Sequence, residues 1–301
     1  MKVYSKLNEI PKGHASDIIT PGCLVQEGGA FKGVYGEGAQ DALMKEGINL
    51  ECAVGVSAGA VNGFNYISGQ LGRPARLNLK YRHHWRYVGL YPLLRDGNAI
   101  GFSFMFSGFA EEEPLDIERF NSPDRRFVAV ATDARTGETV YLERGRSSDI
   151  FKAIRASSAM AYLARPVNLD GLRLLDGACS VKIPYRWALD QGYGKIIVVH
   201  ARLKGSRRDE KPSRLTKICY PFSPRFQAAL DGVNAKANQD EQELMRLEEE
   251  GRLINIYPSK DLGVSHLEKD VEKLGELYWL GYNDTLSAMP RIKAYLAKSI
   301  D

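Results

Sequence analysis

Cysteine is scarce in this sequence, and long apolar runs are missing. The four cysteines are scattered, and no two have the Cys-x-x-Cys spacing of a zinc site or the pattern of a disulfide framework. We therefore expect reduced thiols and no bound metal. The first residues lack the continuous apolar run of a signal peptide, and no later stretch is long and apolar enough to span a bilayer. These absences predict a cytoplasmic protein.

The chain also has little net charge. Its 41 Lys and Arg residues against 37 Asp and Glu give a formal charge of +4, and the isoelectric point is near 8.7. This mildly basic balance would help contact with an anionic surface, but it is far from the composition of a nucleic-acid-binding protein. A hydrophobic content of 44% is ordinary for a globular protein. We therefore expect a soluble globular fold and no nucleic-acid partner.

One short stretch is informative about chemistry. Gly55, Ser57 and Gly59 form a Gly-x-Ser-x-Gly pattern between an apolar strand at 51–56 and the start of a helix. Such a turn presents a serine hydroxyl without bulky neighbours, and the N–H groups at the helix start face developing negative charge. The alternative is a glycine-rich strand-to-helix turn that carries a buried, hydrogen-bonded serine.

Two further motifs lie on either side of this serine. Upstream, the strand 23–26 runs into the loop Gly28-Gly29-Ala30-Phe31-Lys32-Gly33, and downstream lies Leu174-Leu175-Asp176-Gly177-Ala178. The loop does not fit a dinucleotide-binding fingerprint, because Ala30 stands at the second glycine position and no acidic residue follows the second strand. It is not a phosphate-binding Walker loop either, since Val34 follows Gly33 where a lysine is required. The strand, helix, strand order predicts a parallel sheet with its site at the carboxyl ends of the strands.

The three motifs in this order resemble those of the bacterial patatin-like phospholipases, and the resemblance runs from about Leu24 to about Tyr295. It implies an α/β fold: a single three-layer α/β/α domain with a mainly parallel central sheet. We expect that domain to cover residues 22–301, including the C-terminal helices, after an N-terminal arm at residues 1–21. Within 267–297 we expect two helices that are broken at Gly281.

The same resemblance implies the roles of the site residues. Ser57 would be the nucleophile on an elbow formed with Gly55 and Gly59, and Asp176 would be its base without an intervening histidine. Backbone N–H groups of the glycine loop would form an oxyanion hole, and no metal or other cofactor would be needed. The residues expected at this hole are Gly28, Gly29, Ala30 and Lys32. The family usually has glycine at position 30 and arginine at position 32, and both departures bear on the rate.

The function implied is hydrolysis of lipid carboxylic esters, of the phospholipase A or lysophospholipase type. Two alternatives stay open. One is a catalytically weak lipid-binding or regulatory protein of the same fold. The other is an α/β-hydrolase-type esterase with a Ser57-Asp176-His200 triad, for which His266 is a weaker candidate than His200.

A lipid or phospholipid ester substrate also raises the question of membrane contact. Three features favour peripheral binding at the inner membrane: the basic and aromatic segment 80–87, the apolar face of 101–109, and the basic loop 202–217. For the apolar face, formed by Phe102, Met105, Phe106 and Phe109, packing into the core is the alternative to a lid beside the site.

Overall fold

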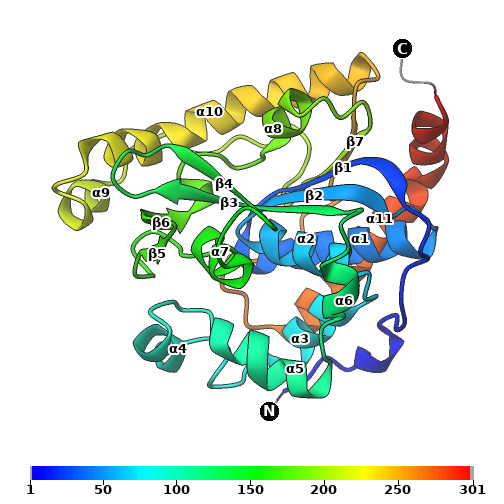
Figure 1. Cartoon of the computed structure of the whole chain (residues 1–301), viewed down its shortest axis with the longest axis horizontal. Helices are drawn as coiled ribbons and strands as arrows, with labels where there is room; N and C mark the ends of the chain where they lie inside the picture. The colour runs from blue at the N-terminus through cyan, green and yellow to red at the C-terminus, as the bar shows by residue number, and fades with distance from the viewer. Residues whose placement is uncertain (1, 299–301) are drawn as a thin grey trace.

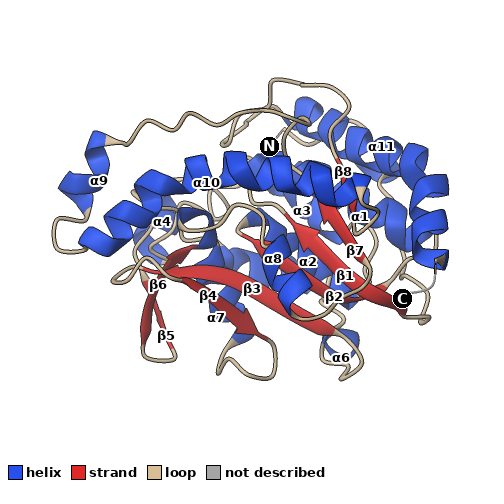
Figure 2. Cartoon of the chain, turned by 90° about the horizontal axis from the view of Figure 1, so that it is seen from above, coloured by secondary structure: helices blue, strands red, loops and turns tan. Residues whose placement is uncertain are grey.

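The computed structural model describes residues 2–298, and these fold around one eight-stranded sheet (Figures 1 and 2). Met1 of the expected arm and residues 299–301 of the expected domain lie outside the described residues. The strand order is β5-β6-β3-β2-β1-β7-β8, with β4 also paired to β3. The strands are β1 (Thr20–Gln26), β2 (Leu50–Val56), β3 (Arg126–Asp133), β4 (Thr139–Glu143), β5 (Val167–Leu169), β6 (Leu172–Asp176), β7 (Ile196–Val199) and β8 (Ile254–Ile256).

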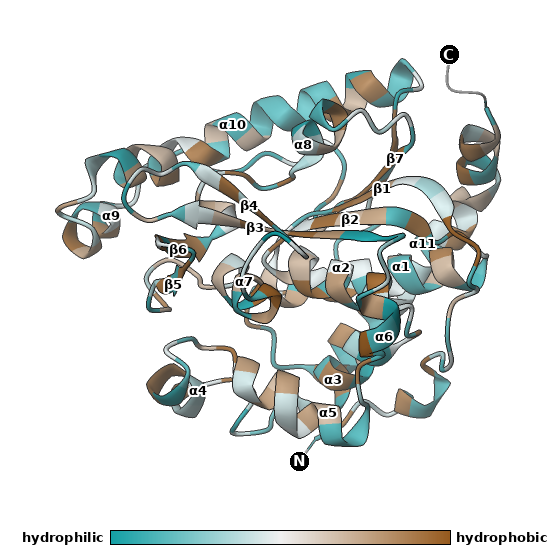
Figure 3. Cartoon of the chain, in the orientation of Figure 1, coloured by the Kyte–Doolittle hydropathy of each residue, from teal (hydrophilic) through white to brown (hydrophobic). Residues whose placement is uncertain are grey.

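The central part of the sheet is parallel, as expected. The pairs β3-β2, β2-β1, β1-β7 and β7-β8 are parallel, whereas β4, β5 and β6 join by antiparallel pairing. Strands that are buried on both faces are typical of parallel sheets, and they read as nearly continuous apolar runs. The brown strands in the middle of Figure 3 show this.

Helices cover both faces of the sheet, which gives the expected three layers (Figure 1). One face packs against α8 (Tyr185–Asp190) and α10 (Pro224–Glu249), and the other against α1 (Val34–Lys45), α2 (Ala58–Ser68), α7 (Ile150–Ser157) and α11 (Val271–Ala297). Alternation along β1 explains the two layers, because Cys23 and Val25 belong to the first core and Leu24 belongs to the second. The shorter helices are α3 (Arg73–Tyr81), α4 (Leu90–Arg95), α5 (Phe109–Glu112), α6 (Ile117–Phe120) and α9 (Arg214–Cys219).

The expected break at Gly281 was wrong, because α11 is one continuous helix. Gly281 instead permits close packing of α11 on α1: a Cβ there would lie 2.0 Å from the carbonyl oxygen of Tyr35. Gly38 plays the matching part on α1, where a Cβ would lie 1.9 Å from the carbonyl oxygen of Tyr278. The glycines therefore mark a helix crossing and not a helix end.

The register of β3 brings two strand ends together. β4 occupies one edge of β3, so β2 and β6 share the other edge. On that edge Val56, the last residue of β2, pairs with Val130, and Asp176, the last residue of β6, pairs with the next residue, Ala131. Because β2 and β6 run in opposite directions, their carboxyl ends meet. The residue after Val56 is Ser57.

Candidate active site

Ser57 occupies a strained turn between β2 and α2. Its φ is +56° and its ψ is −121°, in a region that residues with a side chain rarely adopt. Gly55 and Gly59 allow this turn because the backbone is crowded on both sides: a Cβ at Gly55 would lie 2.1 Å from the Gly59 carbonyl oxygen, and one at Gly59 would lie 2.4 Å from that of Gln26. Backbone strain of this kind is typical of functional sites.

A second serine holds this turn in place. The backbone N–H of Ser57 donates a 2.9 Å hydrogen bond to Oγ of Ser157, and the Ser157 hydroxyl donates a 2.6 Å bond to the carbonyl oxygen of Val130. Ser157 is the last residue of α7 and is completely buried. Sequence reasoning gave Ser157 no role, since nothing in its local pattern indicates a partner so far away in the chain.

Asp176 lies beside Ser57 in a nearly dry setting. Burial raises the pKa of Asp176 from 3.8 to about 6, while the hydrogen bond from the Ala178 N–H, the nearby Ser57 side chain and the charge of Lys182 limit the rise. The bond from the Ala178 N–H to Oδ1 of Asp176 is 2.8 Å long and caps a short 3₁₀ helix at 177–179. A carboxylate with this pKa is a better proton acceptor than an exposed aspartate and is still mostly ionised at neutral pH.

One cavity of about 400 Å³ brings most of the expected site residues together. Its lining includes Gly28, Gly29, Ala30, Lys32, Ser57 and Asp176. Gly55 and Gly59 are not in this lining, because they support the turn from behind. Within residues 2–298, no side chain or carbonyl accepts a hydrogen bond from the N–H groups of Gly28, Gly29 or Ala30. These three donors are therefore available to a ligand in the cavity.

The glycine loop carries its own strain. Ala30 has φ +49°, in the left-handed region that glycine adopts with less cost. The next two residues tie the loop down: the Phe31 N–H donates to the carbonyl oxygen of His266 at 3.1 Å, and the Lys32 N–H donates to that of Gly29 at 3.0 Å.

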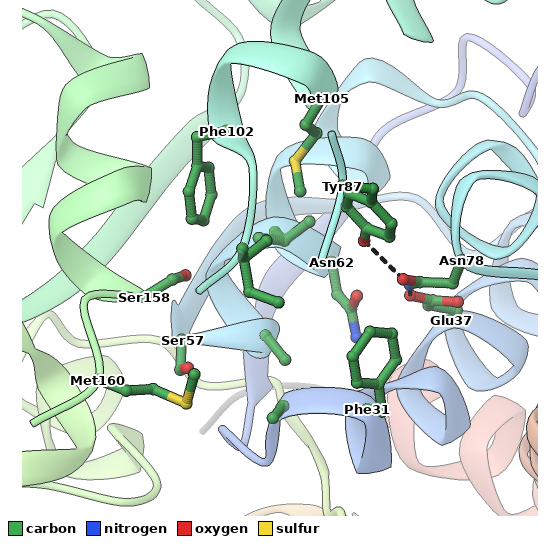
Figure 4. Close-up of a pocket in the computed structure, with 14 residues that line it drawn as sticks. Phe31, Glu37, Ser57, Asn62, Asn78, Tyr87, Phe102, Met105, Ser158 and Met160 are labelled. Atoms are coloured by element: carbon green, nitrogen blue, oxygen red, sulfur yellow. Dashed lines mark hydrogen bonds between the residues drawn. The ribbon is translucent and has the colours of Figure 1, made fainter. Parts of the chain in front are cut away.

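A smaller apolar pocket of about 60 Å³ opens on the other side of Ser57 (Figure 4). It shares Ala30, Ser57 and Met160 with the larger cavity. Phe102 and Met105 form one wall, and the far end holds a polar group in which the Asn78 amide donates to Glu37 at 2.6 Å and the Tyr87 hydroxyl donates to Asn78 at 2.6 Å. Burial raises the pKa of the Glu37 carboxyl well above its usual range, and the hydrogen bond from Asn78 opposes that rise.

The apolar segment 101–109 is therefore core and pocket wall, and it is not an exposed lid. Phe102, Met105 and Phe109 are 2%, 4% and 0% exposed, and Phe106 is half-buried. A π-helical turn at Phe104–Gly108 leads into α5. The hydrophobic spacing that indicated a face was correct, but that face packs inward.

Of the two candidate histidines, the one that the sequence favoured less lies closer to the site: His266 lines the cavity and His200 does not. His200 is buried, forms a 2.9 Å hydrogen bond with Asn255 and stacks on Tyr257, and it does not line the cavity. In the described part of the chain, no hydrogen bond joins His200 to Ser57 or Asp176. His266 does line the cavity. Burial, together with the charges of Lys32 and Arg202, lowers the pKa of His266.

The described residues, 2–298, offer neither a metal centre nor a membrane span. These residues contain no group of three or more His, Cys, Asp or Glu side chains that could hold a metal ion. None of the helices between those limits combines the length and hydropathy needed to cross a membrane.

Comparison with known proteins agrees with this geometry. Residues 24–189 match the family described as patatin-like phospholipase, and residues 223–297 match a domain of unknown function, DUF6363. The chain is 28% identical over 182 residues to the uncharacterised protein YjjU of Escherichia coli, covering 58% of this chain and 50% of that protein. It is 29% identical over 201 residues to an uncharacterised NTE family protein of Mycobacterium tuberculosis, covering 62% and 51%. The chain thus spans about half the length of these two relatives.

Two more distant matches extend the comparison. Lysophospholipase NTE1 of Scheffersomyces stipitis is 28% identical over 200 residues, which is 63% of this chain and 12% of that protein. The crystal structure of VipD from Legionella pneumophila aligns with 91% of this chain and 67% of its own, at a TM-score of 0.47 and 14% identity. The patatin-like match, which covers more than half of the chain and includes the glycine loop, Ser57 and Asp176, shows that the protein belongs to the patatin-like phospholipase family.

Proposed function

We propose that the protein is a serine acyl hydrolase of lipid carboxylic esters, of the phospholipase A or lysophospholipase type. The observation that carries this proposal is the meeting of Ser57 and Asp176 in one cavity, with the pKa of the buried Asp176 raised to about 6. Membership of the patatin-like family and the similarity to a protein named lysophospholipase support the choice of substrate class.

The proposed reaction uses only side chains and N–H groups of the cavity. Oγ of Ser57 attacks the ester carbonyl carbon while its proton passes to Asp176. The N–H groups of Gly28, Gly29 and Ala30 hold the resulting oxyanion, and each such donor is worth about 2.7–4 kcal/mol in comparable sites. Asp176 then returns the proton to the departing alcohol, and water releases the acyl group by the same route in reverse.

The apolar pocket is the proposed site of the acyl group. Its volume of about 60 Å³ has room for roughly four to six water-sized groups. We therefore expect esters of butyrate and hexanoate to be cleaved faster than esters of long-chain acids when both are presented as soluble monomers.

The direct test is active-site labelling followed by turnover. A fluorophosphonate probe is expected to label the protein once, and the label is expected to disappear in Ser57→Ala. The same variant should lose hydrolysis of p-nitrophenyl butyrate by about a thousandfold or more, the scale on which nucleophiles act. Wild-type turnover in a folded Ser57→Ala protein would refute the assignment. Lipid binding without turnover in the wild type would favour the catalytically weak alternative, which is consistent with the strained Ala30 in the oxyanion loop.

We also propose peripheral contact with a lipid surface, through residues that overlap the C-terminal end of the expected basic loop 202–217 and extend beyond it. Helix α9 and the turn after it expose Leu215 at 53%, Ile218 at 72% and Phe222 at 96%. Leu215 and Ile218 lie three residues apart on α9, and Phe222 follows in the turn after it. Basic residues flank all three in the sequence. These neighbours are Lys211, Arg214, Lys217 and Arg225. Apolar side chains flanked by cationic ones complement an anionic bilayer.

A loop links this surface to the site. Met160 lines both pockets beside Ser57, and two residues later the Tyr162 N–H donates to the hydroxyl of Tyr220 at 3.0 Å. The Tyr162 hydroxyl also bonds Thr216 of α9 at 2.7 Å. An anchored α9 would therefore hold the site close to the lipid from which substrate enters.

A further inference from the structure

The larger cavity beside Ser57 has a cationic wall. Four basic side chains line it, and they come from three separate segments: Lys32 belongs to the glycine loop, Lys182 follows the Asp176 turn, and Arg202 and Arg208 belong to the loop after β7. Segments this far apart in the sequence contribute like charges to one cavity, which costs free energy unless an opposite charge is present.

Only one of these four cations has an acidic partner in the described structure. Arg208 pairs with the buried carboxylate of Glu27. Lys182 donates to the carbonyl oxygen of Ala178 at 2.6 Å, and Arg202 donates to the hydroxyl of Ser206 at 3.2 Å. Among residues 2–298, no ion pair is formed by Lys32, Lys182 or Arg202.

The acids of the lining offset this charge only in part, because four basic side chains share the cavity with three acidic ones. The lining acids are Glu27, Asp176 and Asp209. Of these acids, Asp209 accepts a 3.1 Å hydrogen bond from the Lys211 N–H. Glu27 is committed to Arg208, and Asp176 lies at the reacting end of the cavity. Burial lowers the pKa of Lys182, although nearby Asp176 opposes the shift. Burial and the charges of Lys32, Arg202, Lys182 and Arg208 all lower the pKa of His266, as expected beside several cations.

Ser57 stands at the boundary between this cationic cavity and the apolar pocket, since it lines both. An ester that reacts at Ser57 must place one half on each side. Apolar walls suit the acyl half, so the alcohol half enters the cationic cavity. We propose, on the basis of the hydrolase function above, that Lys182 and Arg202, with Lys32, bind a phosphate group carried by the alcohol half of the substrate.

The lining also argues against a zwitterionic choline headgroup. A quaternary ammonium is recognised by aromatic faces, and within the described chain no Phe, Tyr or Trp lines this cavity. Lysine and arginine are the residues that bind phosphate oxygens. The substrate class is therefore an acyl ester of a phosphorylated polyol that ends in an anionic group.

Binding can be tested without turnover. Titration calorimetry on Ser57→Ala is expected to show binding of glycerol phosphate, weaker binding of inorganic phosphate and none of glycerol. Arg202→Gln and Lys182→Gln should each weaken glycerol phosphate about tenfold, which is ~1.4 kcal/mol. The matched control is Arg207→Gln, because Arg207 is an exposed neighbour outside the cavity.

Equal affinity for glycerol and glycerol phosphate, or an equal loss of glycerol phosphate affinity in Arg207→Gln, would overturn the proposal. Stronger binding of inorganic phosphate than of glycerol phosphate would do so too, because it would make free phosphate the ligand.

Steady-state kinetics on two esters that differ in headgroup provides a second test of the phosphate site. Below their micelle concentrations, hexanoyl-lysophosphatidate should have a higher kcat/KM than hexanoyl-lysophosphatidylcholine, and Arg202→Gln should lower the ratio of the two about tenfold. A ratio of one in the wild type, or an unchanged ratio in the variant, would refute the anionic subsite. If no ester at all is cleaved, the proposed function fails, while the calorimetry still decides on the phosphate site.

Discussion

The backbone N–H of Ser57 is bound by the hydroxyl of Ser157, 2.9 Å away, and this bond ties a strained turn to the last residue of α7. The Ser157 hydroxyl has its own acceptor in Val130, so it sits between β3 and the turn. Both partners are buried, which makes the bond costly to lose. The conformation of the proposed nucleophile thus depends on a residue that would not touch substrate.

Ser157→Ala removes this support. We expect the free energy of unfolding to fall by about 1–3 kcal/mol, because a buried N–H and a buried carbonyl lose their partner. We also expect a lower kcat on p-nitrophenyl butyrate with little change in KM, since the turn would be less well held. Urea unfolding and steady-state kinetics measure the two effects. Ser158→Ala is the stability control, because the buried Ser158 hydroxyl has no partner to lose among the described residues. Equal stability of the two variants would contradict the positioning role.

The pH dependence of hydrolysis should follow the pKa of Asp176. Burial raises that pKa to about 6, and the proposed base must be ionised to accept a proton. We expect kcat/KM to be flat above pH about 7 and to fall about tenfold per pH unit below about 6. Measuring kcat/KM on a soluble ester as a function of pH, in buffers of constant ionic strength, gives the apparent pKa of the base. An apparent pKa near the ordinary aspartate value would show that Asp176 is not the base.

The same shift predicts that Asp176 destabilises the fold when it is ionised. Its folded pKa lies above the unfolded value of about 3.9, so the stability that it contributes is present below that value and is lost as pH rises through about 6. Asp176→Asn should therefore be more stable than the wild type by about 3 kcal/mol at neutral pH, with the difference vanishing near pH 4. Urea titrations at both pH values measure this. A variant that is less stable at neutral pH would contradict the buried-charge argument.

Substitutions of the two candidate histidines distinguish a Ser57-Asp176 dyad from a triad that includes a histidine. We expect Asp176→Asn to abolish most hydrolysis and His200→Ala to reduce it little, because His200 bonds Asn255 and lies outside the cavity. His266→Ala should have an intermediate effect, since His266 lines the cavity. Kinetics on one soluble ester, with circular dichroism to check folding, compares the three. A loss of about a thousandfold or more in His200→Ala would restore the triad.

Contact with lipid should depend on α9. The double variant Ile218→Ser and Phe222→Ser is expected to lose most binding to vesicles that contain anionic lipid, because both side chains are largely exposed and apolar. Ile18→Ser is the matched control, since Ile18 is 75% exposed and lies in the N-terminal arm. Co-sedimentation at low and high salt separates insertion from attraction, because each basic residue contributes about 1 kcal/mol that salt screens. Binding that survives the double variant would contradict this surface, and concentration-dependent self-association abolished by it would identify a second copy as the partner.

The parts of the site that sequence could predict are those in which the chemistry is local. The glycine loop and the turn at Ser57 each consist of consecutive residues, so their composition already indicates their shape. The meeting of Ser57 and Asp176 rests instead on the pairing of β6 with β3, which no local pattern reveals and which only the family resemblance suggested. Ser157 was missed for the same reason. Gly281 was misread because a glycine at a helix crossing and a glycine at a helix end look alike until the neighbouring helix is known.

The crossing of α1 and α11 has a consequence for how the chain holds together. Residues 223–297, which match a family separate from the phospholipase one, supply the edge strand β8 and the helix α11 that interlocks with α1. Tyr35 of α1 and Tyr278 of α11 belong to one continuous core. We therefore propose that the two matched segments unfold as one cooperative unit. Cutting the chain between them would strip the support from the helix that follows the glycine loop, so the proposed hydrolase would not survive as a fragment that ends where its family match ends.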